Sequence, residues 1–359
     1  MSTRVALSVD QFYRTQPGGI ATYAAGLVRG LREVNPDVSL VGIAPRGEVP
    51  AALAALDLSL SRGPVPSRLL ARLWPYWPLG VPRDADVVHA TSMAGPFTGG
   101  ASGSRHSVAL HDVLWRDEAA SFTPAGVRFH ERRLTLIRRR RDLIVFTSSP
   151  GLAARLAAEG IVDEDRLHPV RLGVDDGVTP APAARVRAAL TAAGVDGPYT
   201  LYVGTREPRK NLVRLVAAHR RARARADELG PLVLVGPLGW GDVESDDAVI
   251  LGTVSRSLLL GLYRDAALCA YVPLAEGWGL PPVEALHVGT RVVASTSTPS
   301  VSGREGVVTV DPHDVEEIAE GMVRALEDPN DDAARERRRK VVADLTWRHC
   351  ALDHLAGWS

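Results

Sequence analysis

Residues 271–295 read YVPLAEGWGLPPVEALHVGTRVVAS, with an apolar run at each end and a glycine- and proline-rich turn between them. Pro281 and Pro282 suit the first turn of a helix, where a missing backbone N–H costs little, and Gly289 suits the position after its end. The stretch therefore predicts a buried strand, a glycine loop, a short helix and a second strand. Strand, helix and strand in succession form the repeating unit of a parallel sheet.

The same alternation of short β-rich runs with longer runs rich in Ala, Leu and Arg continues on both sides of this stretch. It favours an α/β fold whose parallel sheets are covered on both faces. Apolar spacing near 3.6 predicts helices at 18–34, 128–141 and 315–328, and the tail of the chain also reads as a charged helix. The expected strands, in chain order, are 4–10, 38–44, 85–90, 106–112 and 142–149, then 199–204, 231–236, 248–254, 268–273, 290–295 and 307–310.

Two domains account for this pattern, because it breaks once, at residues 173–198, where Pro and Gly surround a single short helix. We therefore expect an N-terminal domain at 1–180, a C-terminal domain at 181–340, and a helical tail at 341–359 that packs back on the N-terminal domain. Ligands of open parallel sheets bind at the carboxyl ends of the strands, so loops of both domains should meet at a central cleft.

Composition argues against several other classes of protein. The 359 residues carry 42 basic and 42 acidic side chains, so bulk charge provides no attraction for a nucleic acid. Cys269 and Cys350 form neither a disulfide framework nor a zinc spacing, and we expect both to be buried thiols. The start of the chain lacks a signal sequence and no run is long enough to span a membrane, which favours a soluble cytoplasmic protein.

Two glutamates flank the glycine loop of the opening stretch, Glu276 before it and Glu284 after it. We expect Glu284 in the first helical turn, near the positive end of the helix dipole, where an acid can accept two hydroxyls, as from a ribose. Gly277 and Gly279 let backbone N–H groups approach phosphate oxygens, so the acids would bracket an extended ligand with phosphates in its middle. A single acid in a first helical turn more often only compensates the helix dipole and binds no ligand.

A second loop suits the same kind of ligand. Residues 201–219, LYVGTREPRKNLVRLVAAH, read as a strand, a turn and a helix. Arg206, Arg209 and Lys210 cluster at the strand end, before Asn211 opens the helix. Cations beside a helix N-terminus suit a pyrophosphate, although without further context such residues are often only solvated.

Together, GTREPRKN (204–211) and the E-x7-E pattern from Glu276 to Glu284 resemble the retaining glycosyltransferases of family 4, which have the GT-B fold. The similarity is greatest to bacterial mannosyltransferase-like enzymes of polysaccharide assembly. It is strong over 199–312. In the N-terminal half it is weaker and is carried by GGIATY (18–23), DVVHAT (86–91), ALHDVLW (109–115) and VRLGVDD (170–176).

The resemblance implies two Rossmann-like domains that face a central cleft, an acceptor domain at 1–180 and a nucleotide-sugar donor domain at 181–340. It implies transfer of a hexose, with mannose as a candidate, from a GDP- or UDP-sugar to a glycan, lipid-linked or small-molecule acceptor. No metal and no cofactor other than the donor would be required. Acceptor choice would depend on N-terminal loops such as 72–80.

Carried over residue by residue, the resemblance makes Glu276 a contact of the transferred sugar and Glu284 a contact of the ribose, while Arg209 and Lys210 bind the diphosphate. His111, in ALHD, matches a histidine near the reacting sugar, where its ring or carbonyl could stabilise charge at the anomeric carbon. The other implied donor contacts are Gly277, Trp278, Gly279 and Leu280 of the glycine loop, and Gly18 and Gly19 before the first long helix.

Three departures from the family pattern affect this assignment. Many relatives have an arginine directly after the glycine of VG, whereas this chain has Thr205 there and Arg206 next, so either can face the donor. Trp278 replaces the usual phenylalanine of EGFGLP. The segment that usually carries an acid after the last of these strands reads TPSVSGREG here, which leaves the loop at 299–303 without a role.

The mechanism implied by the family retains the anomeric configuration on one face of the sugar, and the departing phosphate helps to take the acceptor proton. The chain shows no carboxylate that must act as a covalent nucleophile and no convincing metal-binding acid pair in a strand-end loop. The acid pair Asp175 and Asp176 lies in the expected linker.

Other functions stay open at this point. A non-catalytic nucleotide-sugar-binding protein or a GT-B nucleotide-sugar epimerase would carry the same loops. A phosphorylase would need a much longer chain, and a dinucleotide-dependent oxidoreductase would need G-x-G-x-x-G, which PGGIATYAAG (17–26) lacks. The run Arg138–Arg141 allows peripheral contact with the inner face of a membrane, although such a run is more often a solvated helix face. The oligomeric state is not indicated.

Overall fold

The computed structural model describes residues 3–174, 177–239 and 248–359, and the chain forms two α/β units. Unit 1 contains Met1–Arg116, Phe122–Asp176 and Leu345–Ser359, and unit 2 contains Asp117–Ser121 and Gly177–Asp344. The acid pair Asp175 and Asp176, expected in the linker, lies outside the described residues. The two cysteines are free and buried, as expected.

Unit 1 is built on a seven-stranded parallel sheet with the order β3-β2-β1-β4-β5-β6-β7. Its strands are β1 (Arg4–Ser8), β2 (Ser39–Ala44), β3 (Ser59–Arg62), β4 (Val87–Ala90), β5 (Arg105–Leu110), β6 (Ile144–Thr147) and β7 (Leu167–Pro169). Every strand expected in this half is present. The additional strands, β3 and β7, are short edge strands, and their sequences SLSR and LHP lack the apolar runs of the central ones.

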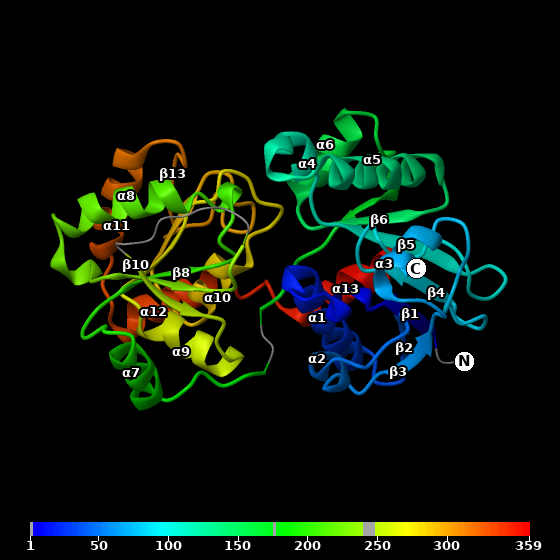
Figure 1. Cartoon of the computed structure of the whole chain (residues 1–359), viewed down its shortest axis with the longest axis horizontal. Helices are drawn as coiled ribbons and strands as arrows, with labels where there is room; N and C mark the ends of the chain where they lie inside the picture. The colour runs from blue at the N-terminus through cyan, green and yellow to red at the C-terminus, as the bar shows by residue number, and fades with distance from the viewer. Residues whose placement is uncertain (1–2, 175–176, 240–247) are drawn as a thin grey trace. The chain divides into compact units, whose positions relative to one another are not determined.

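Helices cover both faces of this sheet, with α5 and α6 on one face and α1 and α13 on the other (Figure 1). The helices of unit 1 are α1 (Gly18–Val34), α2 (Ala51–Ala54), α3 (Ser67–Leu73), α4 (Leu114–Asp117, whose last residue belongs to unit 2), α5 (Pro124–Arg139), α6 (Pro150–Ala158) and α13 (Trp347–Trp358). Apolar side chains of the sheet and of α5 and α6 form a buried cluster between these layers.

Unit 2 is built on a six-stranded parallel sheet with the order β10-β9-β8-β11-β12-β13. Its strands are β8 (Thr200–Val203), β9 (Leu232–Val235), β10 (Ala248–Gly252), β11 (Leu268–Tyr271), β12 (Val292–Ser295) and β13 (Val308–Val310). Helices α8 (Leu212–Arg223) and α11 (Val315–Leu326) pack together on one face, and α7 (Ala183–Ala192), α9 (Arg256–Asp265), α10 (Leu280–His287) and α12 (Asp332–Val341) lie on the other (Figure 1). The expected α/β fold with two parallel sheets is confirmed.

The strand order reverses direction once in each sheet. In unit 1 the chain moves outward from β1 to β3 and then returns to place β4 on the other side of β1. In unit 2 the same reversal occurs between β8 and β11. Loops at the carboxyl ends of the strands on either side of such a reversal diverge and leave room for a ligand, so each unit has one favoured site.

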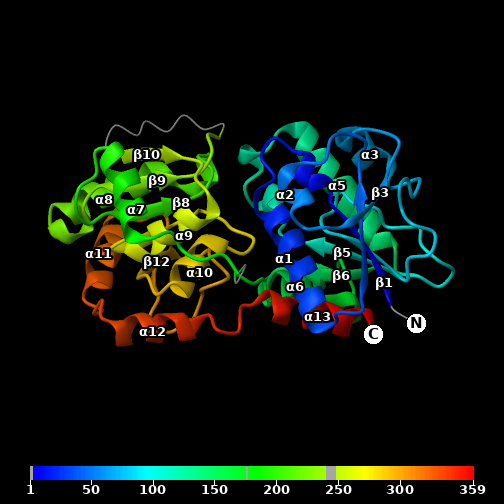
Figure 2. The same cartoon turned by 90° about the horizontal axis from the view of Figure 1, so that it is seen from below.

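The last helix, α13, returns to unit 1 and packs along α1 (Figure 2). Two glycines of α1 allow this close approach. A Cβ atom on Gly26 would lie 2.0 Å from the Trp347 ring, and one on Gly30 would lie 2.0 Å from the Trp347 carbonyl oxygen. On the far side of α13, the Arg171 guanidinium forms an ion pair with Asp353 at 2.5 Å.

A buried hydrogen-bond chain ties α13 to the core of unit 1. His354 Nδ1 lies 2.7 Å from the main-chain carbonyl one helical turn earlier, so it carries the proton and its Nε2 accepts from the Tyr23 hydroxyl at 2.7 Å. The Tyr23 oxygen in turn accepts from His89 Nε2 at 2.8 Å, so His89 Nδ1 is unprotonated. It accepts from Ser107 at 2.9 Å, and Ser107 accepts from the Trp358 indole. Burial lowers the pKa of both histidines, so neutral rings are retained.

We predict that Gly30→Ala lowers the free energy of unfolding by roughly 1–3 kcal/mol or more, because the new methyl group meets backbone rather than a movable side chain. Gly19→Ala is the matched control on the same helix, since a Cβ atom there has no neighbour within 4 Å. It should be neutral or stabilise by up to about 1 kcal/mol. Urea unfolding followed by circular dichroism measures both. Equal effects of the two substitutions would contradict the close packing of α1 on α13.

Candidate active site

In unit 2, the loops after β8 and β11 meet at the point where the strand order reverses. Lys210, on the β8 loop, forms an ion pair with Glu276, on the β11 loop. Arg209 lies 3.4 Å from the same Glu276 oxygen and 2.5 Å from Glu207. A backbone hydrogen bond from Leu274 to the Arg209 carbonyl, 2.9 Å long, holds the two loops together. The structure thus brings three of the predicted residues, Glu276, Arg209 and Lys210, into one cluster.

Tyr271 belongs to this cluster and was not predicted. It is the last residue of β11, and its buried hydroxyl donates to Glu276 at 2.6 Å and accepts from Lys210 at 2.5 Å. The Lys210 ammonium also lies 5.0 Å from the centre of the Tyr271 ring. A tyrosine in an apolar strand normally reads as core, and only its place at the carboxyl end of a central strand indicated a polar role.

Charge and burial oppose each other in this cluster. Burial raises the pKa of Glu276, but the charges of Lys210 and Arg209, with hydrogen bonds from Lys210 and Tyr271, overcome that effect and lower it to about 2. Burial also lowers the pKa of Lys210, and the Glu276 carboxylate opposes that shift. The arrangement is an ionised carboxylate and two cations in a site with little water, where an incoming phosphate would compete with Glu276 for the cations.

The Asn211 side chain holds the β8 loop in place through hydrogen bonds. It adopts the left-handed conformation with φ 60°, which asparagine tolerates better than most residues, directly before α8. Its buried side-chain amide donates to the carbonyls of Val272 at 2.9 Å and Pro312 at 2.7 Å. The side chain therefore ties the cation loop to the ends of β11 and β13, which explains why asparagine rather than a simple helix cap follows Lys210.

The glycine loop has its own support. Gly279 has φ +93°, and a Cβ atom there would lie 2.5 Å from the Thr298 side chain, so only glycine fits. Ser300 donates its hydroxyl to the Gly279 carbonyl at 2.6 Å and its N–H to the Trp278 carbonyl at 3.0 Å. The loop at 299–303, which had no role from the sequence, thus holds the glycine loop. Trp278 is buried, and its indole N–H has no partner among the described residues.

The expected position of Glu284 in the first helical turn is wrong. Helix α10 begins at Leu280, directly after the loop, so Glu284 is its fifth residue and gains little from the helix dipole. Its two carboxylate oxygens instead accept from Arg256 at 2.6 Å and from the Tyr263 hydroxyl at 3.1 Å, both on α9. These two partners were not predicted. Each carboxylate oxygen has a second lone pair, so the acid can still accept hydroxyls from a ligand.

Thr205 and Arg206 follow β8 after Gly204 and are both half-buried. Within the described ranges, the Nε–H of Arg206 is buried and has no hydrogen-bond partner. A buried guanidinium N–H without a partner is costly, so a bound anion would satisfy it. This geometry favours Arg206 over Thr205 for the arginine role, and the assignment stays a prediction.

His111, Gly18 and Gly19 lie in unit 1. His111 follows β5, donates its Nε2–H to the Thr91 carbonyl at 2.9 Å, and has a pKa that burial lowers. Its own carbonyl accepts from Ser148 at 2.6 Å. The expected glycine turn is part of α1, which begins at Gly18 with φ +64°, and both glycines are exposed.

A cavity of about 570 Å³ opens at the reversal point of the unit 1 sheet. Residues that follow β1, β4 and β5 form its inner wall, and α3 and α5 close it on the sides. His111 lines it, as does Ile20, which follows Gly19. Its other inner-wall residues include Gln11, Tyr13, Arg14, Ser92 and Asp112. Unit 1 therefore has a pocket of its own, lined by both polar and apolar side chains.

Residues 197–328 match the model of a protein family described as Glycosyl transferases group 1. The chain is 35% identical to the O-antigen chain mannosyltransferase B of Escherichia coli, over 42% of this chain and 43% of that protein. It therefore spans less than half the length of that relative. It is 26% identical to the MMP alpha-(1->4)-mannosyltransferase of Mycolicibacterium hassiacum, over 96% of this chain and 95% of that protein.

The whole chain is also similar in structure to Anabaena Alr3699/HepE, solved in complex with UDP and glucose. The TM-score is 0.70 with 14% identity, and the match covers 99% of this chain and 98% of that chain. This chain has the GT-B fold, and the match to the Glycosyl transferases group 1 model lies in its unit 2. The resemblance to GT-B glycosyltransferases of the mannosyltransferase-like kind is confirmed.

Two further features are absent from the part of the chain that the structure describes. None of the helices in residues 3–174, 177–239 and 248–359 is long and apolar enough to cross a membrane. In the same part of the chain, no group of three or more His, Cys, Asp or Glu side chains is placed to hold a metal ion.

The ion pair at Glu276 predicts a specific pH dependence of stability. Because the pKa of Glu276 falls from 4.5 to about 2 on folding, its contribution is complete above about pH 4.5 and is lost as the pH falls towards 2. Glu276→Gln should lower the free energy of unfolding at neutral pH, since Lys210 is then buried without its counter-ion. Urea unfolding at several pH values should show the difference from wild type shrinking between pH 4.5 and 2. A difference that does not depend on pH would contradict the ion pair.

Proposed function

We propose that this protein is a retaining glycosyltransferase of family 4 that transfers a hexose, with mannose favoured, from a nucleotide diphosphate sugar to a sugar-containing acceptor. The observation that carries the proposal is the buried cluster of Arg209, Lys210 and Glu276 at the reversal point of unit 2. Two cations and one carboxylate at a ligand-binding edge suit a diphosphate joined to a sugar.

Donor binding in this proposal is an exchange of partners. The diphosphate takes the two cations from Glu276, and the released carboxylate accepts a hydroxyl of the transferred sugar. The buried N–H groups of Arg206 and Trp278, which lack partners among the described residues, gain acceptors from the same ligand. Gly277, Gly279 and Leu280 present the backbone of the loop to it, and Glu284, held by Arg256 and Tyr263, accepts the ribose hydroxyls.

In the transfer step, the bond from the anomeric carbon to the diphosphate breaks while a bond to the acceptor oxygen forms on the same face. The acceptor proton passes to an oxygen of the leaving diphosphate, so no protein base is required. Arg209 and Lys210 stabilise the charge that develops on the leaving group, which is where fixed cations lower a barrier most. His111, held neutral and oriented by Thr91, is the unit 1 contribution near the reacting sugar.

Similar proteins support the substrate classes. Two relatives are named mannosyltransferases, and the similar structure from Anabaena contains UDP and glucose. In this proposal the nucleotide part of the donor is therefore GDP or UDP, and GDP-mannose is the first donor to test. The unit 1 pocket is the proposed acceptor site.

We predict that GDP or UDP raises the melting temperature, and that Lys210→Ala weakens its binding at least about tenfold, because a charge-assisted hydrogen bond is lost. The chain contains one other lysine, the exposed Lys340, so Lys340→Ala is the matched control. Glu284→Ala should also weaken nucleotide binding. Calorimetric titration of each variant measures the affinities. If neither nucleotide binds, or if both lysine variants behave alike, the donor site is misplaced.

Glu276→Gln separates transfer from binding. Because its side chain no longer competes for Lys210, the variant should bind the nucleoside diphosphate at least as tightly as wild type. Transfer from GDP-mannose should fall by about two orders of magnitude. Unchanged turnover would remove the proposed role of Glu276.

Product analysis distinguishes the alternatives. A nucleotide-sugar epimerase would invert a stereocentre of the donor sugar without an acceptor. A non-catalytic binding protein would bind the nucleotide sugar without releasing the nucleoside diphosphate. Transfer with retention requires an α-linked product from an α-linked donor, which proton NMR of the product reads directly.

A further inference from the structure

The unit 1 pocket has a strong positive bias in its lining. Of its charged lining residues, three are arginines, Arg14, Arg68 and Arg72, and one is an acid, Asp112. Arg68 and Arg72 are four residues apart and thus lie on the same side of α3, and both are exposed. Throughout the described part of the chain, neither forms an ion pair with an acid. Arg14 has only a long contact of 4.0 Å with Asp10.

Two residues of the pocket lining each carry a buried polar atom without a partner. Tyr13 and His130 line the pocket, and the Tyr13 hydroxyl and His130 Nδ1 are buried with no hydrogen bond to any described residue. His130 stacks on Trp115 with ring centres 4.7 Å apart, so its ring is fixed in place. Such groups are costly when left unsatisfied, and the hydroxyls of a sugar would supply partners.

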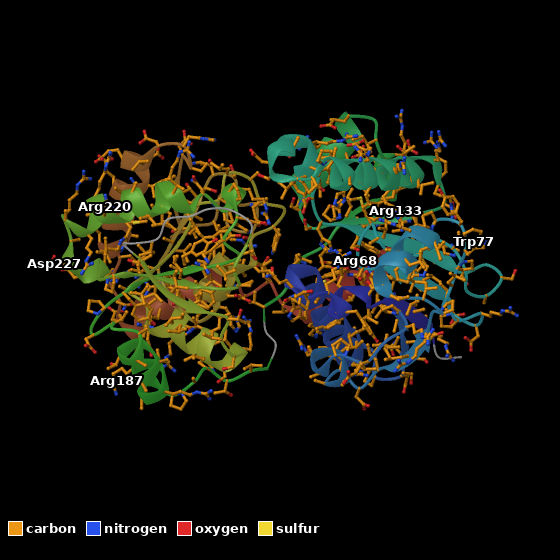
Figure 3. The ribbon with its side chains drawn as sticks, in the orientation of Figure 1. Arg68, Trp77, Arg133, Arg187, Arg220 and Asp227 are labelled. Carbon is orange, nitrogen blue, oxygen red and sulfur yellow. The ribbon has the colours of Figure 1, made fainter. Side chains whose placement is uncertain are left out.

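A buried arginine, Arg133, holds helix α3, which carries the exposed Arg68 and Arg72, in place. Arg133 of α5 donates to the carbonyl of Ala71 on α3 and to that of Ala94 at 3.0 Å, and both alanines line the pocket. Figure 3 labels Arg133 and Arg68. Because Arg133 locks α3 against α5, Arg68 and Arg72 are presented from a rigid backbone rather than from a mobile loop.

We propose that this pocket binds a ligand through a phosphate-type anionic group, held by Arg14, Arg68 and Arg72, with sugar hydroxyls at the polar inner wall. That this ligand is the acceptor rests on the proposed function, whereas the binding itself does not. Phosphate recognition by several arginines follows from their fork of N–H donors, and a neutral sugar would leave Arg68 and Arg72 without a counter-ion.

The phosphate has two sources, a soluble sugar phosphate or the phosphate of a lipid carrier. The segment after Arg72 favours the second, because Tyr76 and Trp77 are 73% and 55% exposed with ring centres 5.7 Å apart. Trp77 is labelled in Figure 3. Leu69 is also exposed, and residues 63–83 contain arginines but no acid. Exposed aromatic side chains beside arginines are typical of surfaces that lie on an anionic bilayer.

The first experiment compares mannose 1-phosphate with mannose by calorimetric titration of the full chain. The phosphate should bind and the neutral sugar should bind at least about tenfold more weakly, with an affinity for the phosphate that falls as salt is raised. The double variant Arg68→Ala/Arg72→Ala should lose this preference. Arg138→Ala/Arg139→Ala is the matched control, since it removes the same charge from exposed arginines of α5 outside the pocket.

The second arm uses phosphatidylcholine vesicles with and without phosphatidic acid in a sedimentation assay. A lipid-borne phosphate predicts binding that requires phosphatidic acid, Arg68 and Arg72, and that Trp77→Ser abolishes without changing the binding of mannose 1-phosphate. A soluble phosphate predicts no vesicle binding and the calorimetric result alone. The proposal is overturned if neither phosphate-bearing probe binds better than its neutral counterpart, or if the Arg138/Arg139 variant loses the preference for mannose 1-phosphate as the pocket variant does.

These outcomes are independent of the proposed function. Loss of GDP and UDP binding would remove the donor site in unit 2 and leave the phosphate preference of unit 1 intact. Donor binding together with no phosphate preference would retain the glycosyltransferase and reject only this pocket assignment.

Discussion

The ion pair between Glu276 and Lys210 is the interaction on which the candidate site of unit 2 depends. It joins two loops from strands that are far apart in sequence, and it does so where burial opposes charge, so each partner requires the other. Tyr271 completes the pair by bonding to both side chains. The carboxylate thus positions both cations without a ligand, and in the proposed function a phosphate replaces it.

The position of this pair follows from the topology. Each sheet reverses its strand order once, and the candidate site of each unit lies in the loops beside that reversal. In unit 2 these loops carry the cations and the glycine turn, and in unit 1 they line the pocket with His111. The same architecture thus produces a compact charged cluster in one unit and an open cavity with three arginines in its lining in the other.

Unit 1 also shows how polar groups can specify a fold. In the chain of hydrogen bonds through His89, Tyr23 and His354, each group donates to the next one along the chain. This arrangement requires both histidines to be neutral. It holds the returning helix α13 in a groove that Gly26 and Gly30 leave open on α1. The C-terminal helix α13 is thereby bound to unit 1, although unit 2 directly precedes it in the sequence.

The α/β fold and the main residues of the candidate site could be predicted from local patterns in the sequence. Strand and helix periods and glycine turns are short-range features, and so is the spacing within each motif, that of Glu276 with Glu284 and that of Arg209 with Lys210. The edge strands β3 and β7 could not be predicted, since they are short and depend on neighbours for their pairing. Tyr271, Arg256, Tyr263 and Ser300 also required the folded chain, because a side chain becomes a partner only when distant strands align it with one. Glu284 shows the limit most clearly, since its place in the motif was evident, but where α10 begins and what holds the carboxylate depended on packing against α9.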